Sequence, residues 1–214
     1  MIHAVVPVKR LEASKSRMLP NLSSQDRDGL SLAMLEDVVA ALTAAKRVDR
    51  IAVVTPDSSV AKIAENAGAE AILFLEEGLN NALNAAAAEL APAPGDGLLV
   101  ILGDVAGALA ADIDALCAAL DDIAAPAIAL APARDGGTAA LLRRPHDAIA
   151  AQFGRDSGRV HRKTAVEADV AYCELKLASL AIDLDDADDL ERFLSLRAGG
   201  TRTRALLESL GWDG

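Results

Sequence analysis

A single carboxylate follows the most continuously apolar stretch of the chain. Leu98 to Leu102 run without polar alternation, which is typical of a strand buried on both faces of a parallel sheet. The run ends at Gly103 and Asp104. Because ligands of open α/β sheets bind beyond the carboxyl ends of the strands, Asp104 is expected in that crevice, where it could hold a magnesium ion. For an isolated Gly-Asp pair, capping a helix or turning a loop is the commoner role.

A second group of acids lies in 'SLAIDLDDADDLERF', near the C-terminal end. If this segment begins as a strand, Asp183 and Asp185 point to the same face, since side chains alternate along a strand. Such a pair of carboxylates suits a divalent cation. Asp185 or Asp186 could instead cap a helix over 187–196, and the run holds enough acids for both roles.

The first twenty residues form a basic segment in an acidic protein. Lys9, Arg10, Lys15 and Arg17 are opposed only by Glu12, a local charge of +3, whereas the whole chain carries −11. Loops after first strands often bind phosphates through glycine N–H groups, but this loop contains no glycine. Any phosphate would therefore be bound by Lys and Arg side chains. Taken alone, the loop would more commonly be a solvated segment.

Two segments in the second half of the chain could also meet an anion. In 'RDGGTAALLRRP' the glycine pair permits tight backbone geometry and Thr138 offers a hydroxyl, although 'DGG' could simply be a turn. In 'QFGRDSGRVHRKTA', Gly154 and Ser157 lead into a helix whose first turn is expected to present free N–H groups to an anion. The single histidine there, His161, is expected to be a solvated helix residue rather than a catalyst.

The segment 'GLNNAL' places two amides at the start of a predicted helix. Asn80 or Asn81 is positioned to cap the backbone N–H groups of that helix. In a nucleotide site the same side chain could read a base or ribose edge. Spacing alone favours the capping role.

Strand and helix patterns alternate along the chain, which is typical of a doubly wound α/β sheet. Unbroken apolar runs predict strands, and apolar positions three and four residues apart predict helices. The expected strands are 2–8, 50–55, 70–75, 98–102, 126–133 and one that begins at 139–142. The expected helices are 24–45, 56–68, 79–90, 111–121, one that follows residue 158, 187–196 and 201–210.

Composition narrows the class of protein. The length of 214 residues suits one α/β domain, 1–214. Its net charge disfavours general binding to nucleic acids. The sequence has no apolar run of the roughly 20 residues that a membrane span needs and does not open with a signal-peptide pattern, so a soluble cytoplasmic protein is expected. Cys117 and Cys173 are isolated and are expected to act as small apolar residues in a reducing compartment.

Taken together, several segments resemble one family, the phospholactate and phosphoenolpyruvate guanylyltransferases of deazaflavin coenzyme F420 biosynthesis. The resemblance covers nearly the whole chain in order. It is carried by 'VPVKRLEASKSRM', 'LAMLEDVVAAL', 'GLNNAL', 'LGDV', 'GGTAALLRRP', 'FGRDSGRVHR' and 'IDLDDADDL'. It implies a Rossmann-like nucleotidyltransferase fold, with a mostly parallel mixed sheet flanked by helices, related to that of molybdenum-cofactor and sugar-phosphate nucleotidyltransferases.

The resemblance also implies an activity. Its members transfer GMP from GTP to a phosphorylated three-carbon acid and release pyrophosphate. The acid could be 2-phospho-L-lactate, phosphoenolpyruvate or 3-phosphoglycerate, and no residue named from the sequence separates the three. A magnesium cofactor and a homodimer are further implications.

The resemblance assigns a role to each candidate residue. In the implied site, Mg²⁺ would be held by Asp104, Asp183 and Asp185. The triphosphate would meet Lys9, Lys15 and Arg17, which join Asp104 as catalytic residues. The phosphate or carboxylate of the acid would be held by Thr138, Gly154 and Ser157, and the guanosine would lie near Gly78 and Asn80. A phosphomonoester is largely ionised at neutral pH and can attack the α-phosphorus of GTP without a general base. The reaction therefore requires no catalytic histidine.

One loop departs from the family pattern. Relatives usually have leucine and proline after the central aspartate, whereas Val105, Ala106 and Gly107 follow Asp104 here. A less rigid loop is expected, with consequences for the choice of acid. Two alternatives stay open: another nucleotidyltransferase, acting on the molybdenum cofactor or a sugar phosphate, or a non-catalytic nucleotide-binding protein of the same fold. The missing glycine-rich loop counts against the first.

Overall fold

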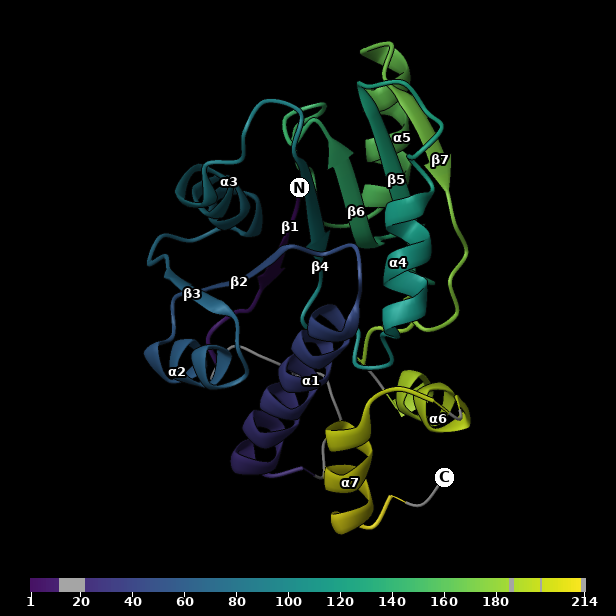
Figure 1. Ribbon diagram of the computed structural model, residues 1–214. Coiled ribbons are helices and arrows are strands. Elements are labelled where there is room, and N and C mark those ends of the chain that lie inside the picture. The colour runs from purple at the N-terminus through teal and green to yellow at the C-terminus, as the bar shows by residue number, and fades with distance from the viewer. Residues whose placement is uncertain (12–21, 185–186, 197, 213–214) are drawn as a thin grey trace.

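The computed structural model describes residues 1–11, 22–184, 187–196 and 198–212, and Figure 1 shows their arrangement. Within these residues, seven strands form one sheet in the order β3-β2-β1-β4-β6-β5-β7, in which β6 alone runs antiparallel to its neighbours. The strands are β1 Ile2–Pro7, β2 Arg50–Thr55, β3 Glu70–Leu73, β4 Gly97–Ile101, β5 Ala127–Pro132, β6 Thr138–Arg144 and β7 Ala171–Glu174. The helices are α1 Ser24–Ala44, α2 Ser58–Asn66, α3 Leu79–Leu90, α4 Ala110–Ala118, α5 Ser157–Glu167, α6 Ala187–Ser195 and α7 Thr201–Ser209.

The sheet is mixed but mostly parallel, as the sequence predicts. Every residue of β4 is buried, which agrees with its unbroken apolar run. This strand pairs in parallel with β1 and antiparallel with β6. Because β6 is reversed, its first residue, Thr138, lies at the edge where β4 ends, and Leu102 N donates to Ala139 O there at 3.1 Å. The reversal therefore brings the start of one strand beside the end of another.

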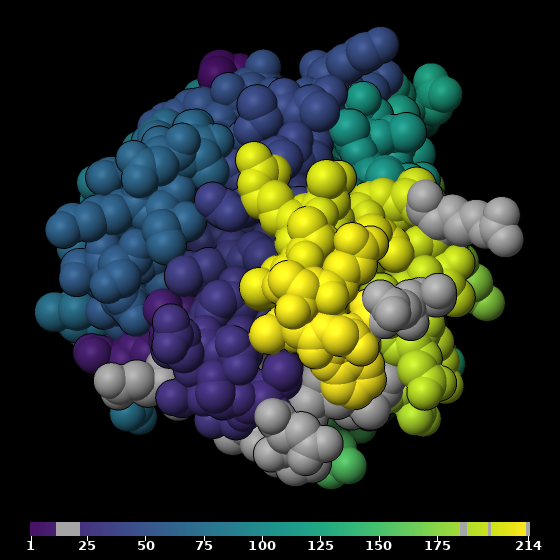
Figure 2. Space-filling view, turned by 90° about the horizontal axis from the view of Figure 1, so that it is seen from below, coloured from purple at the N-terminus to yellow at the C-terminus, as the bar shows by residue number. Residues whose placement is uncertain are grey.

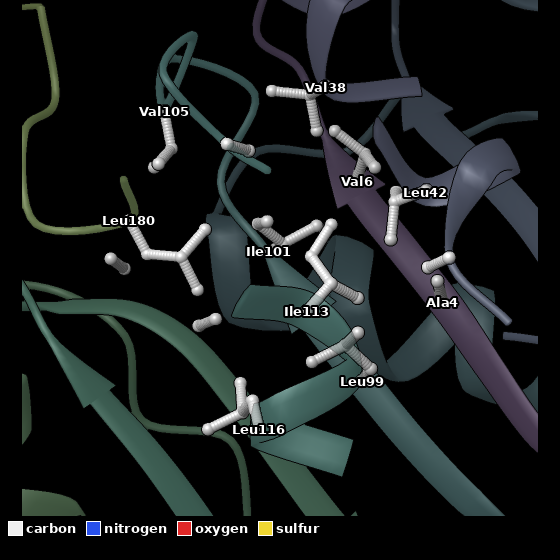
Figure 3. Close-up of a cluster of buried hydrophobic side chains, with 14 of the residues drawn as sticks. Ala4, Val6, Val38, Leu42, Leu99, Ile101, Val105, Ile113, Leu116 and Leu180 are labelled. Atoms are coloured by element: carbon white, nitrogen blue, oxygen red, sulfur yellow. The ribbon is translucent and has the colours of Figure 1, made fainter. Parts of the chain in front are cut away.

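Helices cover both faces of the sheet. On one face, Leu99 and Ile101 of β4 pack with α1, α2 and α4, and Figure 3 shows Ile113 of α4 in this cluster. On the other face, Leu98 and Val100 pack with α3, α5 and the segment before α5. The apolar stripe of α1 is buried, and Ser23 begins that helix with a capping box to Asp26.

The last two helices pack away from the sheet. Figures 1 and 2 both show α7 lying against α1. Together with α6 they enclose a third apolar cluster that includes Leu30 of α1, Ala106 and Phe193. The buried carboxylate of Asp37, on α1, accepts hydrogen bonds from the backbone N–H groups of Arg202 and Thr203, at 3.0 and 2.8 Å. It also accepts from the Thr203 hydroxyl at 2.7 Å. Asp37 therefore caps α7 from another helix.

Replacing Asp37 with Ala is expected to lower the free energy of unfolding by about 2 kcal/mol, because two N–H groups and one hydroxyl would lose their partner in a buried place. Urea denaturation of both proteins measures the difference. The control is Glu36→Ala, since Glu36 makes a surface ion pair with Arg202 and its loss should cost less than about 0.5 kcal/mol. Equal losses in the two variants would contradict the capping role.

Two expectations about the C-terminal third were wrong. The segment over 180–184 forms no strand in the structure, and β7 was not anticipated. Leu180, Ile182 and Leu184 alternate because their side chains are buried from one side, against the loop after β4 and the third apolar cluster, rather than paired in a sheet. The strand geometry expected to align Asp183 with Asp185 is therefore absent at Asp183, and Asp185 lies outside the described residues.

The remaining boundaries agree to within one to three residues. Strand β3 ends at Leu73 rather than Leu75, whose side chain is exposed. None of the helices in the described ranges is long and apolar enough to cross a membrane. Both cysteines are free thiols, Cys117 buried and Cys173 partly buried.

Candidate active site

The carboxyl ends of β1 and β4 leave the sheet in close contact. A Cβ atom on Gly103 would lie 3.1 Å from Val8 Cγ2 and 3.3 Å from Pro7 O, so only a glycine passes there without displacing its neighbours. This contact places Asp104 beside the start of the basic N-terminal segment. The Lys9 side chain at that start is exposed. Lys15 and Arg17 lie outside the described residues, and their roles stay predictions.

Asp104 also lies beside the acidic C-terminal segment. Its backbone carbonyl accepts a hydrogen bond from Leu184 N at 3.3 Å, so the residue next to Asp183 is held against the Asp104 loop. Both aspartates are partly buried. Among the residues with described positions, no group of three or more His, Cys, Asp or Glu side chains could hold a metal ion. The three-aspartate set remains untested because Asp185 is not described.

The loop after Asp104 is packed on both sides. Val105 and Ala106 have no exposed surface, and Figure 3 shows Val105 in the cluster that contains Leu180. A Cβ atom on Gly107 would lie 3.1 Å from Ser179 O, and one on Gly199 would collide with Gly107 O. Gly107 therefore packs closely against the backbone of both Ser179 and Gly199.

Thr138, Ser157 and His161 form a buried hydrogen-bonded group at the same edge of the sheet. Their exposed fractions are 2%, 1% and 0%. Ser157 Oγ donates to Thr138 Oγ1 at 3.0 Å, and His161 Nδ1 lies 3.0 Å from the same oxygen. The structure thus brings together two hydroxyls that the sequence singled out separately and joins them to a histidine that the sequence analysis placed in solvent.

Glycines bring these residues together. Gly158 N donates to Gly136 O at 3.2 Å, and a Cβ atom on Gly158 would lie 2.9 Å from Gly137 O. The 'DGG' turn and the first turn of α5 are therefore docked backbone to backbone. Thr138 follows the turn directly and Ser157 begins the helix, so this docking sets the separation of their hydroxyls.

The expectation of free N–H groups at the start of α5 was wrong. The N–H groups of its first three residues donate to the carbonyls of Gly154, Gly136 and Asp156, at 3.1, 3.2 and 3.0 Å. Close packing by the 'DGG' turn uses the donors that an isolated helix would leave open. An anion at this point would be bound by side-chain hydroxyls instead. Gly154 itself is exposed with φ +141°, a conformation that favours glycine.

The amide of Asn80 holds the segment that precedes Gly154. Asn80 Nδ2 donates to Phe153 O at 3.1 Å, and its Oδ1 accepts from Phe153 N at 2.8 Å. The capping expectation was therefore wrong: Gly78, with φ +109°, is the N-cap residue of α3, and no side chain caps the helix. The proximity of Gly78 and Asn80 to a guanosine stays a prediction.

The ring of His161 is fully inside the protein. Its Nε2 accepts a hydrogen bond from Gln152 N at 3.0 Å, and the Phe153 ring meets it edge to face with centroids 5.2 Å apart. Burial, followed by the nearby positive charge of Arg143, lowers the pKa of His161 to about 4. The expectation of a solvated histidine was wrong. The signal was present in the sequence, because Ser157 and His161 are four residues apart and share one helix face.

A family model described as guanylyl transferase, CofC-like, matches residues 2–214. The chain belongs to this family. A phosphoenolpyruvate guanylyltransferase of Sphaerobacter thermophilus is 41% identical over 88% of this chain and 90% of that protein. A 2-phospho-L-lactate guanylyltransferase of Methanothermobacter thermautotrophicus is 34% identical over 97% and 90%. A 3-phospho-D-glycerate guanylyltransferase of Colwellia psychrerythraea is 33% identical over 87% and 88%.

Solved structures place the CofC-like chain among nucleotidyltransferases by fold. A nucleotidyl transferase from Methanothermobacter thermautotrophicus superposes with a TM-score of 0.65 over 98% of this chain and 99% of that one, at 18% identity. The fold and the family expected from the sequence are therefore confirmed. The named relatives differ in their acid, so membership alone leaves the acceptor open.

Two cavities in the described part of this CofC-like chain lie away from the candidate site. These cavities, of about 330 and 310 Å³, lie at the opposite edge, where β1 and β4 begin and beside the start of β2. Residues such as Met1 and Gly97 line the first, and Arg50 and Glu70 line the second. Neither cavity includes a candidate site residue. The hydrogen-bonded group and Asp104 therefore identify the site by chemistry rather than by volume.

The buried histidine predicts acid sensitivity. Its pKa of about 4 lies below the unfolded value near 6.5, so the unfolded chain binds more protons between these pH values and stability falls as pH falls through that window. The loss should approach about 3 kcal/mol at pH 4. Urea denaturation from pH 7 to 4 of the wild type and His161→Gln measures it. The variant should lack this part of the pH dependence, and parallel curves would contradict the assignment.

Proposed function

We propose that this chain transfers GMP from GTP to a phosphorylated three-carbon acid, with release of pyrophosphate, in coenzyme F420 biosynthesis in the cytoplasm. The observation that carries the proposal is that Asp104 and the hydrogen-bonded Thr138–Ser157 hydroxyl pair lie at the same edge of the sheet. A carboxylate there suits a metal-bound triphosphate, and buried hydroxyls suit the oxygens of a small acid. The three relatives named above support this class of acceptor.

The acceptor supplies its own nucleophile. A phosphate monoester is largely ionised at pH 7, so one of its oxygens attacks the α-phosphorus of GTP while pyrophosphate leaves from the opposite side. The protein must hold two anions in line and neutralise the charge that develops on the leaving group. His161 does not act as a base in this scheme, because both of its ring nitrogens have partners within the protein.

Asp104 and Asp183, with Asp185, would hold the magnesium ion. The ion neutralises charge on the triphosphate when bound, and such ions commonly use one or two carboxylates together with substrate phosphates. Two aspartates held at neighbouring backbone positions fit that donor set. Lys9, Lys15 and Arg17 would meet the departing pyrophosphate with the positive charges of their side chains.

Thr138 and Ser157, with the Gly154 turn, would hold the acid. Gly78 and Asn80 would lie on the guanosine side, where Asn80 acts through the Phe153 backbone that it clamps. A homodimer belongs to the same proposal. Light scattering measures the oligomeric state of the protein in solution and tests this part of the proposal.

Pyrophosphate release tests the proposal. The folded protein is incubated with GTP, Mg²⁺ and, in turn, 2-phospho-L-lactate, phosphoenolpyruvate and 3-phosphoglycerate, with ATP as the control nucleotide. Release with GTP and one acid is expected and names the acceptor. If no pyrophosphate is released with any of the three acids but some is released with a sugar phosphate, another nucleotidyltransferase activity would be favoured. GTP binding without release on any acceptor would favour a binding protein.

A further inference from the structure

The contacts of His161 fix which of its nitrogens carries the proton. A backbone N–H can only donate, so Gln152 N requires His161 Nε2 to be an acceptor without a proton. In a neutral imidazole the proton then lies on Nδ1. His161 Nδ1–H therefore donates to Thr138 Oγ1, across 3.0 Å.

The same oxygen receives a second donor. Ser157 Oγ donates to Thr138 Oγ1 at 3.0 Å, and a hydroxyl oxygen has two lone pairs. With both lone pairs used, the proton of Thr138 is directed to another acceptor. All three side chains are buried, so bulk water does not disturb this order.

The ring is also held in place from outside the group. Phe153 meets it edge to face at an interplanar angle of 69°, and Asn80 grips the Phe153 backbone on both sides. The chain of contacts thus runs from α3, through the segment before α5, to the first residue of β6. A rotation of the His161 ring would break the bonds at both of its nitrogens.

We propose that His161 is a positioning residue that makes Thr138 an obligate hydrogen-bond donor toward an anionic oxygen of the acceptor acid. This inference rests on the proposed function, because it takes the Thr138 edge as the acid site. A substrate hydroxyl offered as a donor finds no acceptor at Thr138, whereas a phosphate or carboxylate oxygen accepts the proton that the Thr138 hydroxyl donates. The site therefore selects acids by their charged oxygens.

A pair of near-isosteric variants separates positioning from packing. His161→Asn places an amide N–H where Nδ1 lies and keeps the donor to Thr138, whereas His161→Gln keeps an acceptor near Nε2 and loses that donor. We expect KM for the acid to rise about 10-fold or more in His161→Gln and less than about 3-fold in His161→Asn. KM for GTP should change less than 2-fold in both variants. Equal changes in the two variants, or a matching rise in KM for GTP, would overturn the proposal.

A second measurement does not depend on turnover. The chain has three histidines, so nitrogen NMR of histidine-labelled protein at pH 7, with His161→Asn for assignment, reports the tautomer of His161 directly. A proton on Nδ1 and none on Nε2 is expected, and the reverse would overturn the inference. If no acid supports turnover, the proposed function is wrong, but the positioning role of His161 can still be tested. Binding of inorganic phosphate, weakened in His161→Gln but not in His161→Asn, would then still support the positioning role, and equal binding would refute it.

Discussion

Replacing Asp104 with Asn is expected to lower kcat for pyrophosphate release by at least about 100-fold. The change keeps the shape of the side chain and removes its charge, at the point where β4 ends between the N-terminal segment and the backbone of Leu184. A neutral amide there would hold a metal-bound triphosphate less well and would stabilise less of the charge that moves during transfer. The measurement is the initial rate at saturating GTP and acid.

The matched control for Asp104→Asn is Asp121→Asn. Asp121 pairs with Arg47 at the opposite edge of the sheet, where both side chains reach solvent, so kcat should stay within about 2-fold. Circular dichroism and the urea midpoint of both variants show whether either change disturbs the fold. Near-normal turnover in folded Asp104→Asn would remove Asp104 from the proposed metal site.

Replacing Phe193 with Ala is expected to lower the free energy of unfolding by about 3 to 5 kcal/mol. Phe193 is fully buried in the cluster that joins α1, α6, α7 and the loop after Asp104. The Arg204 guanidinium lies 4.4 Å from its ring centroid, and a Cβ atom on Gly200 would collide with the ring. Removing the ring leaves a cavity whose backbone walls, built around glycines, cannot easily fill it.

Urea denaturation with a common slope measures the cost of Phe193→Ala. Leu75→Ala is the control, because the Leu75 side chain is 72% exposed and should cost less than about 0.5 kcal/mol. A loss below about 1.5 kcal/mol for Phe193→Ala would show that the C-terminal helices contribute little to the stability of the chain.

Most of the sheet could be predicted because its strands are buried on both faces. Unbroken apolar runs identify β1, β2, β4 and β5, and the helices between them show clear apolar stripes. The edge strand β7 escaped prediction because it is only four residues long and its Ala171 and Tyr172 side chains are exposed, so its short apolar run does not read as a buried strand. Conversely, 180–184 has the alternation of a strand, but burial from one side produces the same pattern without sheet pairing.

The site was predictable where the chemistry follows from chain order. Asp104 and Thr138 lie at the same edge of the sheet because one strand ends where its antiparallel neighbour begins, although only the structure shows that β6 is that neighbour. The burial of His161 could have been inferred from the helix face that it shares with Ser157, but the N–H groups of α5 could not have been judged correctly. The 'DGG' turn packs on the start of α5, and that long-range contact leaves no local mark in the sequence beyond the glycines themselves.

The fate of the α-phosphorus of GTP tests the central claim most directly. With GTP radiolabelled at that phosphorus, Mg²⁺ and the acid that supports pyrophosphate release, the label should move into a product in which GMP is joined to the phosphate of the acid. That product should be nearly absent with Asp104→Asn. Label that remains in GTP, or that appears only as free GMP whichever acid is present, would contradict transfer to a phosphorylated acid.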